Sequence, residues 1–87
     1  MSRTTNEIIP TIRRFITEEL LERELIVSED TPLIEGGYLT SLQTIELVSF
    51  LMQEFAVEIE PEEINEQEFR SLTSISELVQ RKSTRAM

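Results

Sequence analysis

The sequence of 87 residues contains no cysteine, no histidine and no tryptophan. Without cysteine or histidine the chain cannot form a disulfide, a thiolate zinc site, an iron–sulfur cluster, or a Ser-His-Asp or Cys-His catalytic arrangement. A chain of this length makes one small domain, which buries only about 60% of the surface that its unfolded form exposes. We therefore expect a single domain over residues 1–87, ordered over about 5–82 with frayed termini, and no buried catalytic cleft.

Long apolar runs and an apolar leader are also absent. No segment approaches the roughly 18–20 uninterrupted apolar residues that a membrane-spanning helix needs. The first residues, Met-Ser-Arg-Thr-Thr-Asn-Glu, lack the apolar stretch of a signal peptide. We therefore expect a soluble, cytoplasmic monomer that does not bind membranes.

Basic residues are few and unevenly placed. The chain has 8 basic and 17 acidic side chains, a formal net charge of −9, and no basic residue lies between Glu24 and Glu68. Such a field repels nucleic-acid phosphates and attracts basic protein surfaces. We expect no binding of nucleic acid and favour an Arg- or Lys-rich protein partner, although an acidic surface also simply keeps a small protein soluble.

The spacing of apolar residues predicts two long amphipathic helices. The first covers about residues 5–21, and Pro10 is compatible with it if it lies in the first turn, where the missing N–H costs no hydrogen bond. The second covers residues 41–55 and begins with a capping box of Thr40 and Gln43, which makes Ser41 its first helical residue. Three apolar residues of this helix extend beyond its core-facing side and predict a surface for a partner: Leu42, Ile45 and Met52.

Turn residues separate these two helices. Pro32 and the pair Gly36-Gly37 predict a long loop, and the glycines indicate either a backbone bend or the close approach of another molecule. We expect five apolar residues to hold this loop to the core: Leu25, Ile26, Val27, Leu33 and Ile34.

After the second helix, Pro61 and its acidic neighbours predict a short third helix, with Ile59, Ile64 and Phe69 available for burial. The segment from Ser74 to Glu77 fits a second capping box and predicts the start of the last helix. The expected fold is all-α, a small bundle of three principal helices and one short helix.

Few side chains could carry chemistry. The acidic run of Glu58, Glu60, Glu62 and Glu63 lacks the spacing of a calcium loop and is expected to be a solvated surface. No nucleophile has a base beside it in the sequence, so an independent enzyme is not expected and no metal site is assigned. A phosphate ester on Ser41 would lie at the positive end of its helix. Alternatively, the Ser41 hydroxyl simply accepts hydrogen bonds from backbone N–H groups there.

The wider context of Ser41 closely resembles the acyl carrier protein family, including freestanding carriers of polyketide and nonribosomal peptide synthesis. Residues 30–48 read DTPLIEGGYLTSLQTIELV, residues 54–59 read EFAVEI, and residues 69–75 read FRSLTSI. The resemblance in order and spacing covers about residues 8–81.

In that family the serine of an Asp-Ser-Leu motif is esterified with 4′-phosphopantetheine from coenzyme A. The resemblance implies that Ser41 is the attachment residue, modified by a separate phosphopantetheinyl transferase that supplies magnesium and a base. The terminal thiol of the group would then carry acyl or aminoacyl thioesters among acyl-loading and acyl-processing synthase enzymes. The implied pathways are polyketide, nonribosomal peptide or fatty-acid-like biosynthesis.

Two departures from the family pattern concern recognition. Thr40 replaces the usual aspartate, which keeps a helix cap but removes a charge that transferases commonly meet. Gln43, Met52 and Gln53 make this helix less acidic than in fatty-acid carriers. The expected docking residues are Thr40, Leu42, Ile45, Glu46 and Met52. The rival interpretation, favoured by Thr40, is a carrier-like module that binds proteins without being modified.

Overall fold

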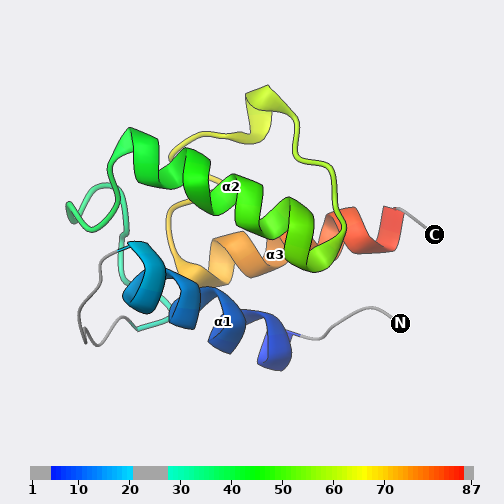
Figure 1. Ribbon diagram of the computed structural model, residues 1–87, viewed down its shortest axis with the longest axis horizontal. Coiled ribbons are helices and arrows are strands. Elements are labelled where there is room, and N and C mark those ends of the chain that lie inside the picture. Colours follow the sequence, from blue (N-terminus) through cyan, green and yellow to red (C-terminus); the bar gives the residue numbers. More distant parts are fainter. Residues whose placement is uncertain (1–4, 21–27, 86–87) are drawn as a thin grey trace.

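The computed structural model describes residues 5–20 and 28–85, with side chains over residues 7–20 and 28–83. The elements follow the order α1 (Thr5–Arg14), the π-helix η1 (Phe15–Leu20), α2 (Ser41–Phe55), the 3-10 turn η2 (Pro61–Glu63) and α3 (Leu72–Arg85). In Figure 1, α3 lies behind α1 and α2 and packs against both, while η1 packs against α2. The described residues contain no strand, so the predicted all-α bundle is confirmed. None of their helices is long and apolar enough to cross a membrane.

The first helical segment buries the side that its sequence pattern predicts. Four isoleucines are buried, while Phe15 and Leu20 are partly buried against the same core. The isoleucines are Ile8, Ile9, Ile12 and Ile16. The predicted extension to residue 21 and the core contacts expected of Leu25, Ile26 and Val27 lie outside the described residues.

Pro10 does not occupy the position at which a proline costs no helical hydrogen bond. Pro10 is the sixth residue of α1, not part of its first turn, so the carbonyl of residue 6 loses its usual helical N–H donor. Such a proline costs about 3 kcal/mol, whereas each buried isoleucine contributes roughly 1.5–3 kcal/mol. Burial of Ile8 and Ile9 on the core side therefore offsets the cost of keeping this turn helical.

The core is completed by apolar residues of α2, α3 and the segment that joins them. The buried members are Leu47, Val48, Leu51, Val57, Ile59, Phe69, Leu72, Ile75, Leu78 and Val79. Phe50 adds a ring stacked on Phe15, with centroids 4.0 Å apart and planes at 12°. Only one face of α2 packs into the core, so the opposite face lies at the surface.

The last helix begins at Leu72, two residues before the predicted capping box of Ser74 to Glu77. Ser71 Oγ accepts a hydrogen bond from the Ser74 N–H at 3.3 Å, so Ser71 provides the capping hydroxyl. Leu72 is fully buried and extends the apolar arc toward the N-terminus, which favours this earlier start. The predicted box from Ser74 to Glu77 was therefore wrong, and the hydroxyl of Ser76 instead donates to Thr73 O at 3.0 Å.

The loop before α2 is held by Leu33. This side chain is fully buried, its N–H donates to Arg70 O at 2.8 Å, and its carbonyl accepts from the Tyr38 N–H at 2.8 Å. The predicted bend at the glycines is confirmed: Gly37 has φ +79°, and a Cβ on Gly36 would lie 2.4 Å from Pro32 O. The loop thus delivers the chain to the start of α2 in a fixed path.

Candidate functional site

The start of α2 is closed by the predicted reciprocal cap. Thr40 Oγ1 accepts from the Gln43 N–H at 3.1 Å, and the Thr40 N–H donates to Gln43 Oε1 at 3.0 Å. Thr40 itself has extended backbone, with φ −83° and ψ 173°. The confirmed capping box therefore satisfies two backbone N–H groups at this end of the helix without help from any other side chain.

Ser41 is the first residue of α2, as predicted, and its side chain is exposed. Because Thr40 and Gln43 make the cap, the Ser41 hydroxyl is not needed for it. In the part of the chain that the structure describes, this hydroxyl has no hydrogen-bond partner. The N–H groups of Ser41 and Leu42 have no acceptor inside the helix, so they leave the positive end of α2 beside the hydroxyl.

A groove of about 350 Å³ opens beside Ser41. Its walls come from three parts of the chain: the loop before α2, the first turns of α2, and the residues that follow η2. The lining residues are Ile34, Ser41, Thr44, Ile45, Ile64, Asn65 and Glu66. Three isoleucines give the groove an apolar lining.

Two polar residues in this lining already have partners. Thr44 Oγ1 donates to Thr40 O at 2.9 Å. Asn65 Nδ2 donates to Glu62 O at 2.9 Å, while Asn65 Oδ1 accepts from the Glu68 N–H at 2.8 Å. Both side chains therefore serve to shape the walls, and the groove fits a largely apolar occupant.

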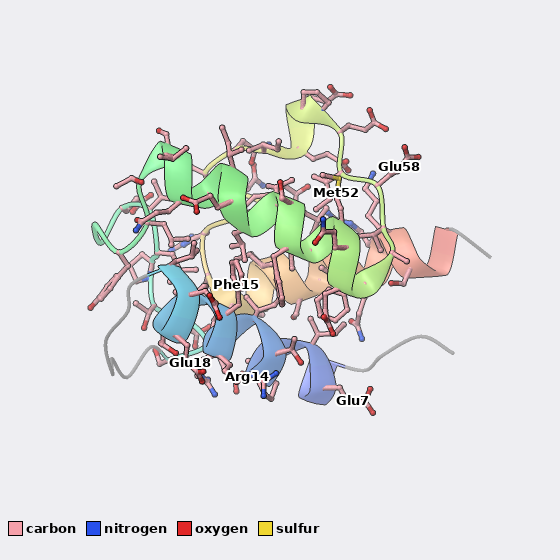
Figure 2. All side chains as sticks on the ribbon, in the orientation of Figure 1. Glu7, Arg14, Phe15, Glu18, Met52 and Glu58 are labelled. Carbon is pink, nitrogen blue, oxygen red and sulfur yellow. The ribbon has the colours of Figure 1, made fainter. Side chains whose placement is uncertain are left out.

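The predicted docking residues lie along α2 and at its N-cap, from Thr40 next to Ser41 to Met52, about three turns further along the helix. Leu42 is 68% exposed, Ile45 is 55% exposed and Met52 is 36% exposed, the large apolar side chains at the surface among the described residues. Thr40 and Glu46 are also exposed. Met52 lies on the side of α2 away from α1, whereas Phe15 lies on the side of its helix toward α2 (Figure 2). The surface of α2 next to Ser41 is thus apolar and acidic at once.

Several groove residues were not predicted as part of the site. For Ile34 and Ile64 the sequence predicted only burial in the core. It gave no prediction for Thr44, Asn65 and Glu66. The side chains of 64–66 reach α2 only because the chain after η2 folds back across it. No local pattern in the sequence encodes such an approach between distant segments.

The acidic run shows one perturbed carboxyl. A hydrogen bond from Lys82 and another from the Glu60 N–H hold the pKa of Glu63 below its ordinary value. Among residues 5–20 and 28–85, no three His, Cys, Asp or Glu residues are grouped so that they could hold a metal ion.

Comparison with known families identifies the type of domain. The chain matches the family described as "Phosphopantetheine attachment site" over residues 10–81, which is more than half of its length. The chain belongs to this family. The match includes α2 with Ser41 and confirms the resemblance to acyl carrier proteins. A search of curated proteins found no match.

Membership of the phosphopantetheine attachment family settles the general chemistry. Its domains are attachment sites for covalently bound 4′-phosphopantetheine. They are in general non-catalytic carriers that interact with synthases and modifying enzymes. The protein is therefore a carrier of the phosphopantetheine type.

Proposed function

We propose that Ser41 is the residue that carries 4′-phosphopantetheine, and that the protein is an acyl or aminoacyl carrier. The observation that carries this proposal is that the cap at the start of α2 does not use the Ser41 hydroxyl. Thr40 and Gln43 cap the helix, and the Ser41 hydroxyl between them stays exposed and outside the cap. A serine that served only to satisfy backbone donors would itself accept one of these hydrogen bonds.

The residues around Ser41 fit such a group. A phosphate on Ser41 Oγ would lie beside the N–H groups of Ser41 and Leu42, at the positive end of α2. The groove lined by Ile34, Ile45 and Ile64 begins at the same serine and offers apolar walls to the rest of the arm. When bound, the group supplies the terminal thiol that the protein, which has no cysteine, does not itself contain.

Attachment requires a second enzyme. Ser41 Oγ would form a bond to the pantetheine-side phosphorus of coenzyme A, the phosphoanhydride bond would break, and adenosine 3′,5′-bisphosphate would leave. The chain has no histidine, so the hydroxyl proton would pass to a base of a phosphopantetheinyl transferase, which also supplies magnesium. Ser41 is thus a nucleophile only while the transferase is docked.

The exposed side of α2 is proposed as the docking face for the transferase and for acyl-loading and acyl-processing synthase enzymes. Leu42, Ile45 and Met52 would supply apolar contact, while Glu46 would guide basic partners toward Ser41. Such contacts are small and short-lived. A tethered thioester reaches an effective concentration of roughly millimolar at each docked active site, so the carrier needs no catalytic residue.

The same surface bears on the choice of partners, and the family resemblance supports a proposal for the pathway. With Gln43, Met52 and Gln53 on α2, the helix selects partners by apolar contact more than by charge density. We propose polyketide, nonribosomal peptide or fatty-acid-like biosynthesis as the setting. In it the chain would act as a cytoplasmic monomer.

A second candidate is a module that binds the same partners without being modified. Thr40 favours it, because the charge that transferases commonly meet before the serine is missing. Ser41 and the exposed apolar face weigh against it, since a module without an arm has no need of that hydroxyl beside a groove.

Intact-mass measurement separates the two candidates. The folded protein would be incubated with coenzyme A, magnesium and a transferase of broad specificity. The carrier proposal predicts the added mass of one phosphopantetheine on the wild type, none on Ser41→Ala, and full addition on Ser49→Ala, an exposed serine of the same helix. Unmodified wild type with transferases of several specificities would favour the non-covalent module.

A further inference from the structure

One wall of the groove is formed by residues 64–66, which belong to the segment from Ile59 to Phe69. This segment makes few apolar contacts of its own. The residues at its two ends are buried, with Ile59 8% exposed and Phe69 0% exposed. Between them Ile64 is partly buried, and most of the remaining side chains are exposed. A segment with so little apolar burial opens locally at low free energy unless other contacts hold it.

Two ion pairs supply these contacts from the C-terminal half of α3. Lys82 Nζ lies 2.6 Å from Glu63 Oε1, with only 12% and 21% of the two side chains exposed. An Arg81 nitrogen lies 2.9 Å from each carboxylate oxygen of Glu68. The Arg81 side chain is 55% exposed, so water and salt screen that pair more strongly than the Lys82 pair.

Both pairs act next to residues that line the groove. Glu63 directly precedes Ile64, and its Oε1 also accepts from the Glu60 N–H at 2.8 Å. Glu68 is tied to Asn65 through the hydrogen bond from its N–H. Figure 1 shows the turn η2 on the side of α2 away from α1, where these contacts from α3 reach it. Fixing the two carboxylates therefore fixes the side chains that face Ser41.

We propose that Lys82 is a positioning residue for the groove beside Ser41: its ion pair with Glu63 holds the wall of residues 64–66 at its distance from α2, and the Arg81–Glu68 pair adds a second tie. The wall's function as a support for the arm rests on the proposed attachment at Ser41. The claim that Lys82 holds residues 64–66 in place concerns the unmodified protein and is tested on the unmodified protein.

The first test measures amide hydrogen exchange in the unmodified protein. Lys82→Met keeps the length of the side chain and removes its charge, while Glu63→Gln keeps the acceptor for the Glu60 N–H. Each variant is expected to exchange about fivefold faster over residues 61–69, with α1 and α2 unchanged. The double variant should exchange no faster than either single variant, since both remove one interaction.

Arg70→Met is the matched control, because it removes an exposed positive charge from the same region. It should leave exchange over residues 61–69 unchanged. Unchanged exchange in Lys82→Met, or equal acceleration in α2 and in residues 61–69, would overturn the proposal, since the latter would mean a general loss of stability.

The second test uses the phosphopantetheinylated protein. Alkylation of the arm thiol by iodoacetamide should be about twofold to fivefold faster in Lys82→Met than in wild type, and unchanged in Arg70→Met. Equal rates in all three proteins would overturn the link between this wall and the arm. If even the wild type accepts no phosphopantetheine, the proposed attachment at Ser41 fails, and hydrogen exchange still decides the role of Lys82.

Discussion

The side-chain amide of Gln43 donates to the carbonyl of Leu20 at 3.2 Å, across 23 residues of sequence. The same amide accepts from the Thr40 N–H and so closes the cap of α2. One side chain therefore joins the end of η1 to the start of α2. The position of Ser41 relative to the first helical segment depends on this bridge.

Gln43→Glu tests the bridge, because glutamate keeps the acceptor for Thr40 but cannot donate to Leu20. We expect the free energy of unfolding to fall by about 1 kcal/mol for Gln43→Glu, and by up to about 2 kcal/mol for Gln43→Ala, which loses both hydrogen bonds. Urea unfolding measures both values. A Glu variant as stable as wild type would show that the contact with Leu20 contributes nothing.

Thr40→Asp tests the departure from the family motif. Aspartate keeps an acceptor for the Gln43 N–H, so helicity and stability should change little, while modification of Ser41 by a generic transferase should become faster. Thr40→Ala is the control: it removes the cap and should lower the free energy of unfolding by about 1 kcal/mol. Circular dichroism and initial rates check both. Equal modification rates for threonine and aspartate would make the missing charge irrelevant.

Substitutions at two leucines of α2 distinguish an effect on partner docking from an effect on folding stability. Leu42 is 68% exposed and Leu47 is fully buried. Leu42→Ala should lower kcat/KM of the transferase at least severalfold while stability stays within about 0.5 kcal/mol of wild type. Leu47→Ala should instead lower the free energy of unfolding by about 2–5 kcal/mol. Normal modification kinetics in Leu42→Ala would remove this side chain from the docking face.

Acid should weaken the tie between η2 and α3. The pKa of Glu63 is lowered in the folded protein by the hydrogen bond from Lys82 and by that from the Glu60 N–H. A carboxyl with a lowered folded pKa stabilises the protein above its unfolded pKa, and that contribution disappears as the pH falls through its folded pKa. Wild type should therefore protect the amides of residues 62–69 from exchange more strongly than Glu63→Gln at neutral pH, and this difference should shrink in acid. Protection factors measured across pH 7 to 3 test this, and a constant difference would contradict the assignment.

The sequence was sufficient where a local rule decides the structure. The box of Thr40 and Gln43, the helical start at Ser41 and the exposure of Leu42 all follow from residues within one or two turns of each other. The last helix shows the limit of such rules. Both Ser71 and Ser74 could cap it, and the burial of Leu72, a tertiary effect, selects the earlier residue.

Features that join distant segments could not be predicted in this way. The groove needs Ile34 and Ile64 to meet beside Ser41, which only the folded paths of two loops bring about. The pairing of Lys82 with Glu63 likewise depends on how α3 passes η2. The helical place of Pro10 depends on the burial of Ile8 and Ile9 in the core, which outweighs the local preference.

The most direct test of the central claim is to locate the attached group in the wild-type protein. After treatment with coenzyme A and a transferase, cleavage at Arg23 and Arg70 yields a peptide of residues 24–70, which contains three serines, Ser28, Ser41 and Ser49. Fragment-ion mass spectrometry should place one phosphopantetheine on Ser41. A group found on any other residue of this peptide, or a peptide that stays unmodified in protein shown to be folded, would contradict the account.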